Sequence, residues 1–403
     1  MAYRKKRAYI VQYGFIFYYF YLVNDILYIE ILHKDSKNIR KRLQTNIKEF
    51  SACLDNSSNT IHIVGLDTSH RLIHLFYKEN IWKKRLIPDF KLDSTQLSSL
   101  RVYCHRDKLN LILSKSHNPR MGIWKIIHLA ISNRTFNLWK VAEIHINKHL
   151  LPYRIDIDMD NNIHVIYRSM RKDRHILFYR MFNSKYSKWS LAAKLSRDED
   201  DVINMNLLCD TKNYIHVVWS YLHDKNIKVN YLRKKTTSPL TSGWKKSKTF
   251  PNILSNFTNP ILLQCKDYIK LIWKMNDKFY YAKAKSDRDL WSSARTIKGY
   301  FNHPIIPITY IGSSYKEQEL VKLPFAYGYY NKEIFIMGLD EPSIEDGFPG
   351  LSFKEINKNP FKSISLEEEK DMRLNLKRFT ENIKAQLNKE EIISNILYNK
   401  KNN

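Results

Sequence analysis

Ile163-His-Val-Ile-Tyr167, entered from the turn Asp160-Asn-Asn162, is the stretch that decides the fold of this chain. Strands of the same kind begin at Ile61, Leu109, Ile215 and Ile269, so the pattern returns about every fifty residues. A tryptophan follows each copy, namely Trp82, Trp139, Trp189, Trp244 and Trp291. Two markers that keep one order through five copies indicate a structural repeat, and this period is typical of the four-stranded blades of a β-propeller.

The third copy shows the plan of one blade. It divides into four expected strands: Tyr153–Met159, Ile163–Arg168, His175–Met181 and Trp189–Leu195. Apolar residues fill many of the positions that strict alternation would leave polar, as expected for sheets covered on both faces. A blade cannot bury both faces alone, so we predict an all-β fold in which the blades stack around one axis.

The ends of the repeat region set the blade count. Residues 8–45 resemble a degenerate blade, and residues 303–339 supply three further strands, near Ile305–Ile311, Leu320–Tyr327 and Glu333–Leu339. The preferred count is therefore seven blades, with six as the alternative. A closed ring leaves no exposed sheet edge, so either Leu351–Ile356 or an N-terminal strand should complete the last blade.

Three segments make up the predicted domain organisation: a propeller over residues 1–340, a linker or closing strand over 341–362, and an amphipathic helix over 363–403. Ser363 and Ser365 are suitable residues for a helix N-cap. An apolar stripe follows at helical spacing, formed by Met372, Leu376, Phe379, Ile383 and Leu387. Such a helix either docks on its own domain or recruits a protein partner.

A formal charge of +27 arises from 67 Lys and Arg against 40 Asp and Glu. A field of this sign attracts polyanions such as acidic glycans or nucleic acid. The same abundance of lysine, asparagine and isoleucine is typical of an AT-biased genome, which raises lysine content without any selected partner. Both interpretations stay open.

The apolar stretch Tyr13–Val23 near the start of the chain is too short to span a bilayer as a helix. Its aromatic residues, followed by Asn24-Asp25, favour a β-hairpin. We therefore predict no transmembrane span and a cytoplasmic location with free thiols, the alternative being export or anchoring through this stretch.

The repeat resembles the sialidase-like, BNR-type superfamily of propellers. In Asp158-Met-Asp-Asn-Asn-Ile-His-Val-Ile-Tyr167 and Asp210-Thr-Lys-Asn-Tyr-Ile-His-Val-Val-Trp219, an Asp-bearing turn leads into an Ile-His-Val strand. The resemblance covers residues 50–297 and implies a propeller fold. The Asp-box of that superfamily is absent from every copy, and Ser187-Lys-Trp189 keeps only its tail. No catalytic residue is carried over, and loss of catalysis is the expectation.

The basic loop of the third copy is the candidate ligand-binding site. Its guanidinium, ammonium and phenol groups suit an anionic sugar or phosphate, and they come from Tyr167, Arg168, Arg171, Lys172, Arg174 and Tyr179. The competing interpretation is a solvated hairpin tip.

Equivalent histidines and cysteines recur in the repeat. His62, His164 and His216 share one strand position, where hydrogen bonding between blades is favoured over metal binding. Four cysteines fall near the ends of first strands, which favours small packing residues over a reactive thiol: Cys53, Cys104, Cys209 and Cys265.

Two acidic groups could hold calcium or act as a glycosidase carboxylate pair. Asp156, Asp158 and Asp160 alternate along one strand, and residues 198–201 form an acidic run. Neither has the full ligand pattern of a calcium loop, so a turn and a solvated loop are favoured. No metal site and no cofactor are predicted.

The function predicted from the sequence is a non-enzymatic binding or scaffold protein that uses a propeller face for an anionic glycan or a protein partner. The alternatives are a divergent glycoside hydrolase and a nucleic-acid-binding protein.

Overall fold

A computed structural model describes residues 8–336. Within that range it leaves out 14–15, 33–38, 79–80, 88–95, 106–107, 117, 133–135, 147–150, 224, 240–241, 248–249, 251–257, 276–277, 289, 298–305, 313–320 and 332. The predicted linker and terminal helix, residues 341–403, lie outside the described residues. Among the described residues the one helical element is a 3-10 turn, η1 (Pro119–Met121).

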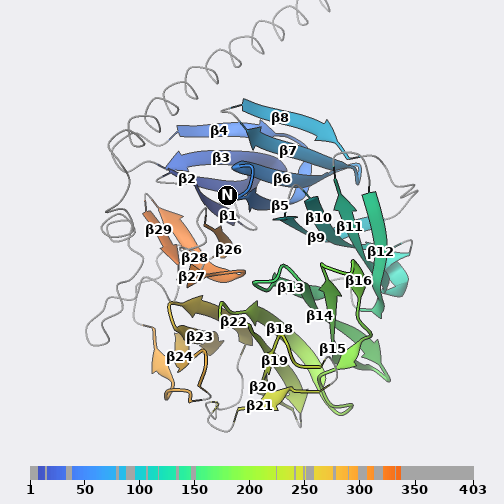
Figure 1. The fold of residues 1–403 in the computed structure, drawn as a ribbon, viewed down its shortest axis with the longest axis vertical. Coiled ribbons are helices and arrows are strands. Elements are labelled where there is room, and N and C mark those ends of the chain that lie inside the picture. Colours follow the sequence, from blue (N-terminus) through green and yellow to red (C-terminus); the bar gives the residue numbers. More distant parts are fainter. Residues whose placement is uncertain are drawn as a thin grey trace, which may run out of the picture.

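Six sheets surround a central axis and form a six-bladed β-propeller (Figure 1). Blade one is β1 (Ala8–Tyr13), β2 (Ile16–Val23), β3 (Ile26–Leu32) and β4 (Ile39–Gln44). Blade two is β5 (Ile47–Asp55), β6 (Thr60–Asp67), β7 (Leu72–Lys78) and β8 (Ile81–Leu86). Blade three is β9 (Gln96–His105), β10 (Lys108–Ser116), β11 (Ile123–Ile131) and β12 (Phe136–His145).

The second half of the ring repeats the plan. Blade four is β13 (Tyr153–Ile157), β14 (Ile163–Arg171), β15 (Arg174–Asn183) and a fourth strand in two pieces, β16 (Lys188–Trp189) and β17 (Ala193–Lys194). Blade five is β18 (Asp201–Cys209), β19 (Tyr214–His223), β20 (Asn226–Lys235) and β21 (Lys245–Lys246). Blade six is β22 (Thr258–Cys265), β23 (Tyr268–Met275), β24 (Lys278–Lys285) and β25 (Arg295–Thr296).

The five aligned copies of the repeat are confirmed as second strands of blades two to six. Within each blade the strands follow chain order by antiparallel pairing, and in blades two to five the first strand faces the centre of the ring (Figure 1). The apolar stretch at the N-terminus is also strand: it forms β2, which continues into β3 through Asn24 and Asp25 at positive φ (49° and 58°). That turn matches the twist of a two-residue hairpin, so the hairpin prediction is confirmed.

The preferred count of seven blades is not supported. Of the three additional strands, β26 (Ile306–Ile311) and β29 (Glu333–Ile336) form near their expected positions. The strand expected at Leu320–Tyr327 is instead divided between β27 (Val321–Lys322) and the start of β28 (Ala326–Asn331). These strands do not make a sheet of their own, because β26 pairs in parallel with β1 from Ala8↔Ile308 to Val11↔Ile311. An N-terminal strand thus joins the two ends of the described chain, while Leu351–Ile356 lies outside the described residues.

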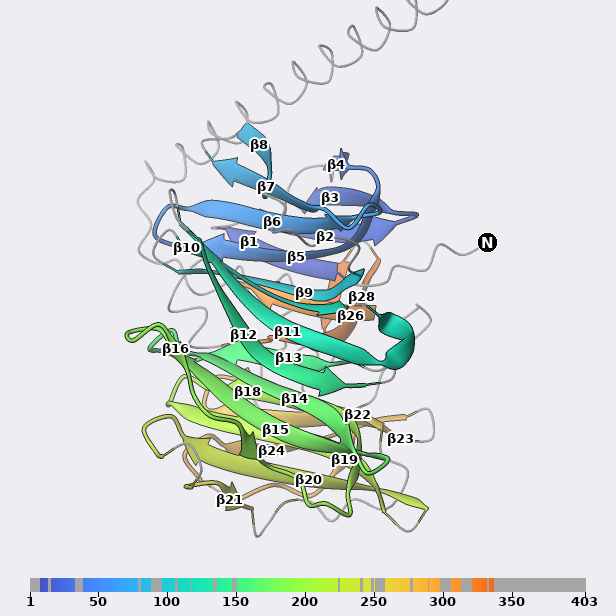
Figure 2. The same cartoon turned by 90° about the vertical axis from the view of Figure 1, so that its right-hand side faces the viewer.

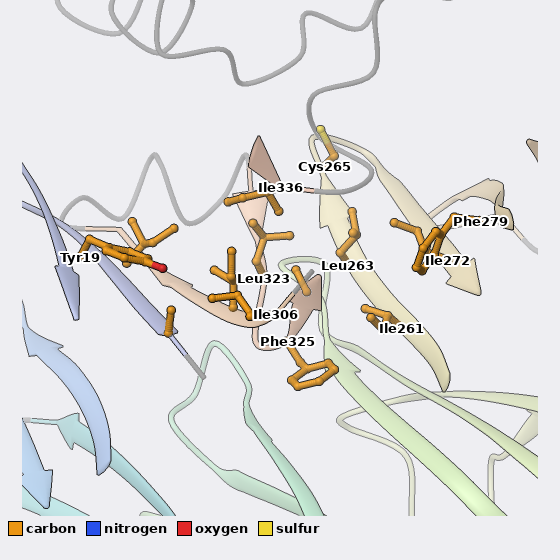
Figure 3. Packing of buried hydrophobic residues seen from close by; sticks show 14 of the residues in the cluster. Tyr19, Ile261, Leu263, Cys265, Ile272, Phe279, Ile306, Leu323, Phe325 and Ile336 are labelled. Atoms are coloured by element: carbon orange, nitrogen blue, oxygen red, sulfur yellow. The ribbon is translucent and has the colours of Figure 1, made fainter. Parts of the chain in front are cut away.

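The core is divided into clusters between neighbouring sheets, which lie over one another as twisted layers (Figure 2). The repeated tryptophans explain the second marker of the repeat, because they pack across these interfaces. Trp291, for example, contacts Tyr231 of blade five edge-on, with ring centroids 5.2 Å apart. Where the ring closes, Ile306 and Leu323 lie between Tyr19 of β2 and Leu263 of β22 (Figure 3).

In the described part of the chain, no helix is long and apolar enough to cross a membrane.

Candidate functional site

Half of the predicted basic site lies inside blade four. The side chains of Tyr167, Arg168 and Tyr179 are all buried. Arg168 is 2% exposed and donates to the carbonyl oxygens of Val202 (3.2 Å) and Ile203. Burial lowers the pKa of its guanidinium to about 10, so the group is still charged at neutral pH.

The other half of the predicted site forms the exposed tip of the β14–β15 hairpin. Arg171 lies 4.9 Å from the ring centroid of Phe178, and Arg174 donates to the carbonyl oxygen of Glu199 at 2.7 Å. Lys172 lies at the turn itself, with φ of 46°. The structure therefore does not bring the six residues together on one surface, and a role for the tip remains a prediction.

A cavity of about 440 Å³ lies at the hub of the ring, between the first strands of the blades. We call it the hub cavity. Its aromatic, charged and imidazole side chains come from Tyr9, Asp55, Arg101, Tyr103, His105, Arg154, Asp156, Asp158, Tyr310, Lys322 and Phe325. Two first strands, β9 and β13, supply five of these at alternate positions, Arg101, Tyr103 and His105 from β9 and Arg154 and Asp156 from β13.

The acidic side of the hub cavity is already bonded. Asp156, which is 5% exposed, accepts hydrogen bonds from the amides of Cys209 (2.6 Å) and Ile157 (2.9 Å). Its carboxylate also pairs with the ammonium group of Lys322 at 3.1 Å. Burial lowers the pKa of Lys322, but Asp156 and the other neighbouring groups together outweigh it and the net shift is upward, so the ammonium group keeps its charge.

Lys322 comes from the closing segment of the ring. It lies on β27 (Val321–Lys322), a short strand that pairs with β22 of blade six. Its ammonium group also donates to the carbonyl oxygens of Ile157 and Cys209. A single side chain thus ties the closing segment to blades four and five across the hub.

The two arginines of the cavity are held by the protein. Arg154 lies 3.8 Å from the ring centroid of Phe325 and donates through Nε to the carbonyl oxygen of Met205 at 3.4 Å. Arg101 has an ion-pair contact of 3.7 Å with Glu49. Burial lowers the pKa of Arg101, but the surrounding phenols and Glu49 outweigh it, so its guanidinium keeps its charge.

Phenol groups line the rest of the cavity. Tyr9 donates to the hydroxyl of Ser51 (3.1 Å), and that oxygen in turn accepts from the amide of Val102 (3.0 Å) in the next blade. Burial raises the pKa of Tyr103 well above its ordinary value, so its hydroxyl is neutral. The cavity therefore combines neutral phenols with positioned cations.

Both ring nitrogens of His164 and of His216 bond within the same blade, so the prediction of bonding between blades is wrong for these two histidines. His164 bonds the hydroxyl of Tyr179 (2.8 Å) and the carboxylate of Asp158 (2.9 Å). His216 repeats this with Tyr231 (2.7 Å) and Asp210 (2.9 Å). The geometry follows from the repeat: the aspartate of the turn lies six residues before the histidine, and the tyrosine lies on the third strand, two residues from the position that pairs with the histidine.

His62 bonds His74 at 2.9 Å, also within one blade. All four cysteines lie near the ends of first strands, as expected, in β5, β9, β18 and β22. Cys53 and Cys104 line the hub cavity.

The acidic groups considered for calcium are engaged in the fold. Asp158 accepts from the amides of Asp160 (2.9 Å) and Asn162 (2.8 Å) in the turn. In the run 198–201, Asp198 pairs with Lys194 at 2.6 Å and Asp201 with His175 at 2.9 Å. Among the described residues, no group of three or more His, Cys, Asp or Glu side chains is placed to hold a metal ion.

Among the residues that line the hub cavity, only Asp156, Asp158, Cys53 and Cys104 are singled out from the sequence. The sequence does carry a signal for this cavity in β9, where Arg101, Tyr103 and His105 occupy alternate positions of a first strand. First strands of a propeller surround its axis, so polar residues on their inner face deserve priority.

No protein-family model and no curated protein matches this chain. Among solved structures it is similar to an ulvan lyase of polysaccharide lyase family PL25, with a TM-score of 0.52 and 11% identity over 79% of this chain and 88% of that one. The structure of a PL25 ulvan lyase bound to -[GlcA(1-4)Rha3S]- is similar with a TM-score of 0.51 and 12% identity, again over 79% of this chain and 88% of that one. Polysaccharide lyase Uly1 is similar with a TM-score of 0.51 and 8% identity over 83% of this chain and 87% of that one. At these identities the likeness shows the fold alone, a β-propeller. It does not confirm the sialidase-like superfamily.

Proposed function

We propose that this protein binds an anionic saccharide in the hub cavity, without catalysing a reaction on it. The observation that carries the proposal is the placement of Arg101 and Arg154 beside Tyr103 and Phe325 in one cavity. Aromatic rings pack against the apolar faces of sugars, and guanidinium groups pair with carboxylate or sulfate in a fixed geometry. A volume of about 440 Å³ is within the usual range of small-molecule sites.

A ligand with negative charge is favoured by the charge of the whole chain. The net charge of +27 raises the local concentration of acidic polymers near the surface. One of the similar propellers was determined bound to a saccharide containing GlcA and Rha3S, so this fold is known to take an acidic saccharide.

The lining carboxylates favour binding over hydrolysis. A glycosidase acid needs a carboxyl group with a raised pKa and a second carboxylate on the other side of the scissile bond. Burial raises the pKa of Asp158, but hydrogen bonds from His164 and Asn162 outweigh it, and the net shift is downward. Asp156 is held by Lys322 and two amides. The alternative function is a divergent, sialidase-like glycoside hydrolase, and an assay of glycoside hydrolysis would test it.

Arg154→Gln tests the hub cavity directly. We expect it to weaken binding of a glucuronate-containing tetrasaccharide by about tenfold or more, because hydrogen bonds to charged groups contribute about 1.5–3 kcal/mol. Isothermal titration calorimetry measures the change. The matched control is Arg171→Gln at the tip of the β14–β15 hairpin. Like Arg154, Arg171 lies over a phenylalanine ring, but it is outside the hub cavity.

The control should stay within about twofold of the wild type, the range expected for an exposed charge. A larger loss in Arg171→Gln than in Arg154→Gln would move the ligand to the predicted basic tip. No loss in either variant would refute both sites.

Binding of acidic polymers should weaken as salt rises. We expect the dissociation constant for the same tetrasaccharide to increase roughly fivefold between about 50 and 500 mM NaCl, since ions screen exposed charges. Isothermal titration calorimetry at each salt concentration measures this change. An affinity that is constant across this range would contradict an ionic contribution to recognition.

A further inference from the structure

Blades five and six carry a second feature at the same strand positions, a tyrosine flanked by two cations. In blade five, Tyr214 begins β19 and pairs across the sheet with Lys235, while His216 pairs with Arg233. Directly paired residues share one face of the sheet, so the two cations lie on the side of Tyr214. The guanidinium of Arg233 is 4.9 Å and the ammonium of Lys235 is 5.6 Å from the ring centroid.

Blade six repeats the arrangement. Tyr268 begins β23 and pairs with Lys285, and Lys270 pairs with Lys283. The ammonium groups of Lys283 and Lys285 lie 5.6 Å and 6.0 Å from the ring centroid of Tyr268. We call the triplets Tyr214–Arg233–Lys235 and Tyr268–Lys283–Lys285 the two aromatic–cation modules.

The fold itself does not require these modules. The residue before the aligned strand position is Thr60 in blade two, Lys108 in blade three and Asn162 in blade four. Those blades form the same four-stranded sheets without a tyrosine at this point. A purely structural role would be expected to recur from blade to blade, whereas among blades two to six this feature is found in two neighbours.

Both modules lie at the end of the ring that the hub cavity reaches. The cavity is lined by residues of the turns between first and second strands, including Asn56, Asn161 and Thr211. Tyr214 and Tyr268 directly follow such turns, and Lys235 and Lys285 end the third strands beside them.

Polar contacts connect the two modules to each other and to the cavity. Thr211, which lines the cavity, accepts a hydrogen bond from Gln264 of blade six at 2.7 Å and donates its amide to the same side chain at 3.0 Å. Arg233 donates to the carbonyl oxygen of Ser286 at 3.1 Å, directly after the strand that ends at Lys285. The surface from the hub to blade six is therefore fixed by bonds between blades.

The chemistry of a module suits one sugar residue with a negative group. Tyr214 and Tyr268 are partly exposed, and Lys235 and Lys285 are exposed. A phenol ring offers a flat apolar contact and a hydroxyl, and each ammonium group offers donors for carboxylate or sulfate. Two such modules on adjacent blades suit a polymer whose charge repeats along its length.

We propose that the two aromatic–cation modules are outer subsites for consecutive residues of an acidic polysaccharide, one unit of which occupies the hub cavity. This inference rests on the proposed function, and it extends the ligand from a single saccharide to a chain that crosses blades five and six.

The experiment compares two double variants with equal loss of charge. Lys235→Gln/Lys285→Gln changes both modules. Lys245→Gln/Lys246→Gln changes two exposed lysines of β21, the outer strand of blade five. The probes are glucuronate-containing oligosaccharides of two and of ten units, and calorimetry gives both affinities for each protein.

We expect the module variant to weaken binding of the ten-unit chain by about tenfold, since two charged contacts are lost, and to leave the two-unit ligand within about twofold. The β21 variant should leave both ligands within about twofold. Equal losses in the two double variants, or none in either, would overturn the inference, because position would then not matter.

Failure of the hub function is separable from failure of the modules. If Arg154→Gln changes neither ligand while the module variant still weakens the long chain, the hub function fails and the subsites are upheld. If Arg154→Gln weakens binding of both ligands and the module variant weakens binding of neither, the hub function is upheld and the subsites fail. A single-stranded oligonucleotide of equal charge that binds more tightly, with the same dependence on Lys235 and Lys285, would overturn the assignment to a polysaccharide.

Discussion

Asp156→Ala is expected to lower the free energy of unfolding by about 3–5 kcal/mol, the range for removing one partner of a buried ion pair. The carboxylate is 5% exposed and holds the Lys322 ammonium and the amide of Cys209. Alanine would leave an unpaired cation at the hub together with an amide that has lost its acceptor. Urea denaturation followed by tryptophan fluorescence measures the change.

Two further variants separate the ion pair from general effects of substitution. Asp198→Ala removes a carboxylate from a pair that is just as short, 2.6 Å to Lys194, but 80% exposed. It should leave the free energy of unfolding close to the wild-type value, because an exposed ion pair contributes little to stability. Asp156→Ala/Lys322→Ala should be more stable than Asp156→Ala alone, since the uncompensated charge is gone. A double variant whose loss equals the sum of the single losses would show that the pair is not coupled.

The strand content of the ring could be predicted because it is a local property. The copies that begin at Ile163 and Ile215 carry their own turn, histidine and apolar faces, and both form the expected second strands. The blade count could not be obtained in this way. It depends on β26 pairing in parallel with β1, which lies about 300 residues earlier, and no local pattern reports such a contact.

The residues of the candidate site were harder to predict from the sequence, again because contacts distant in the sequence decide where they lie. Arg168 and Arg171 are three residues apart on one strand, yet Arg168 is buried and Arg171 is exposed. The sequence shows that this segment is basic. Which of its side chains reach solvent depends on the alternation along the strand and on how deeply the sheet is buried. Lys322 illustrates the converse case, because its partner Asp156 comes from another blade and only the closed ring brings the two together.

Buried histidines should make the protein sensitive to mild acid. Burial lowers the pKa of His74 and of His128 from 6.5 to about 3, and for His74 the nearby His62 and Arg85 act in the same direction. The Arg85 Nε–H group donates to His74 Nδ1 at 2.9 Å, so protonation at that nitrogen would break the bond. His128 stacks on Trp139, with centroids 4.8 Å apart, in a largely apolar interface.

The sign of the effect follows from which state binds the proton. Between pH 6.5 and about pH 3 the unfolded chain protonates these two histidines and the folded protein does not. Stability is therefore full above pH 6.5 and falls as the pH decreases, by about 1.4 kcal/mol per pH unit for each histidine. Asp158 and Asp210, whose pKa values are lowered in the fold, add to the loss only below about pH 4.

His128→Phe is expected to remove about half of this dependence between pH 6.5 and 4.5. Phenylalanine keeps a ring against Trp139 and has no group to protonate, so the unfolded chain gains one proton fewer. Urea denaturation at pH 7.0, 5.5 and 4.5 gives the slope of stability against pH. His145→Phe replaces an exposed histidine and should keep the wild-type slope. If His128→Phe retained the full slope as well, the imidazole at the interface of blades three and four would not be the group that makes the propeller sensitive to acid.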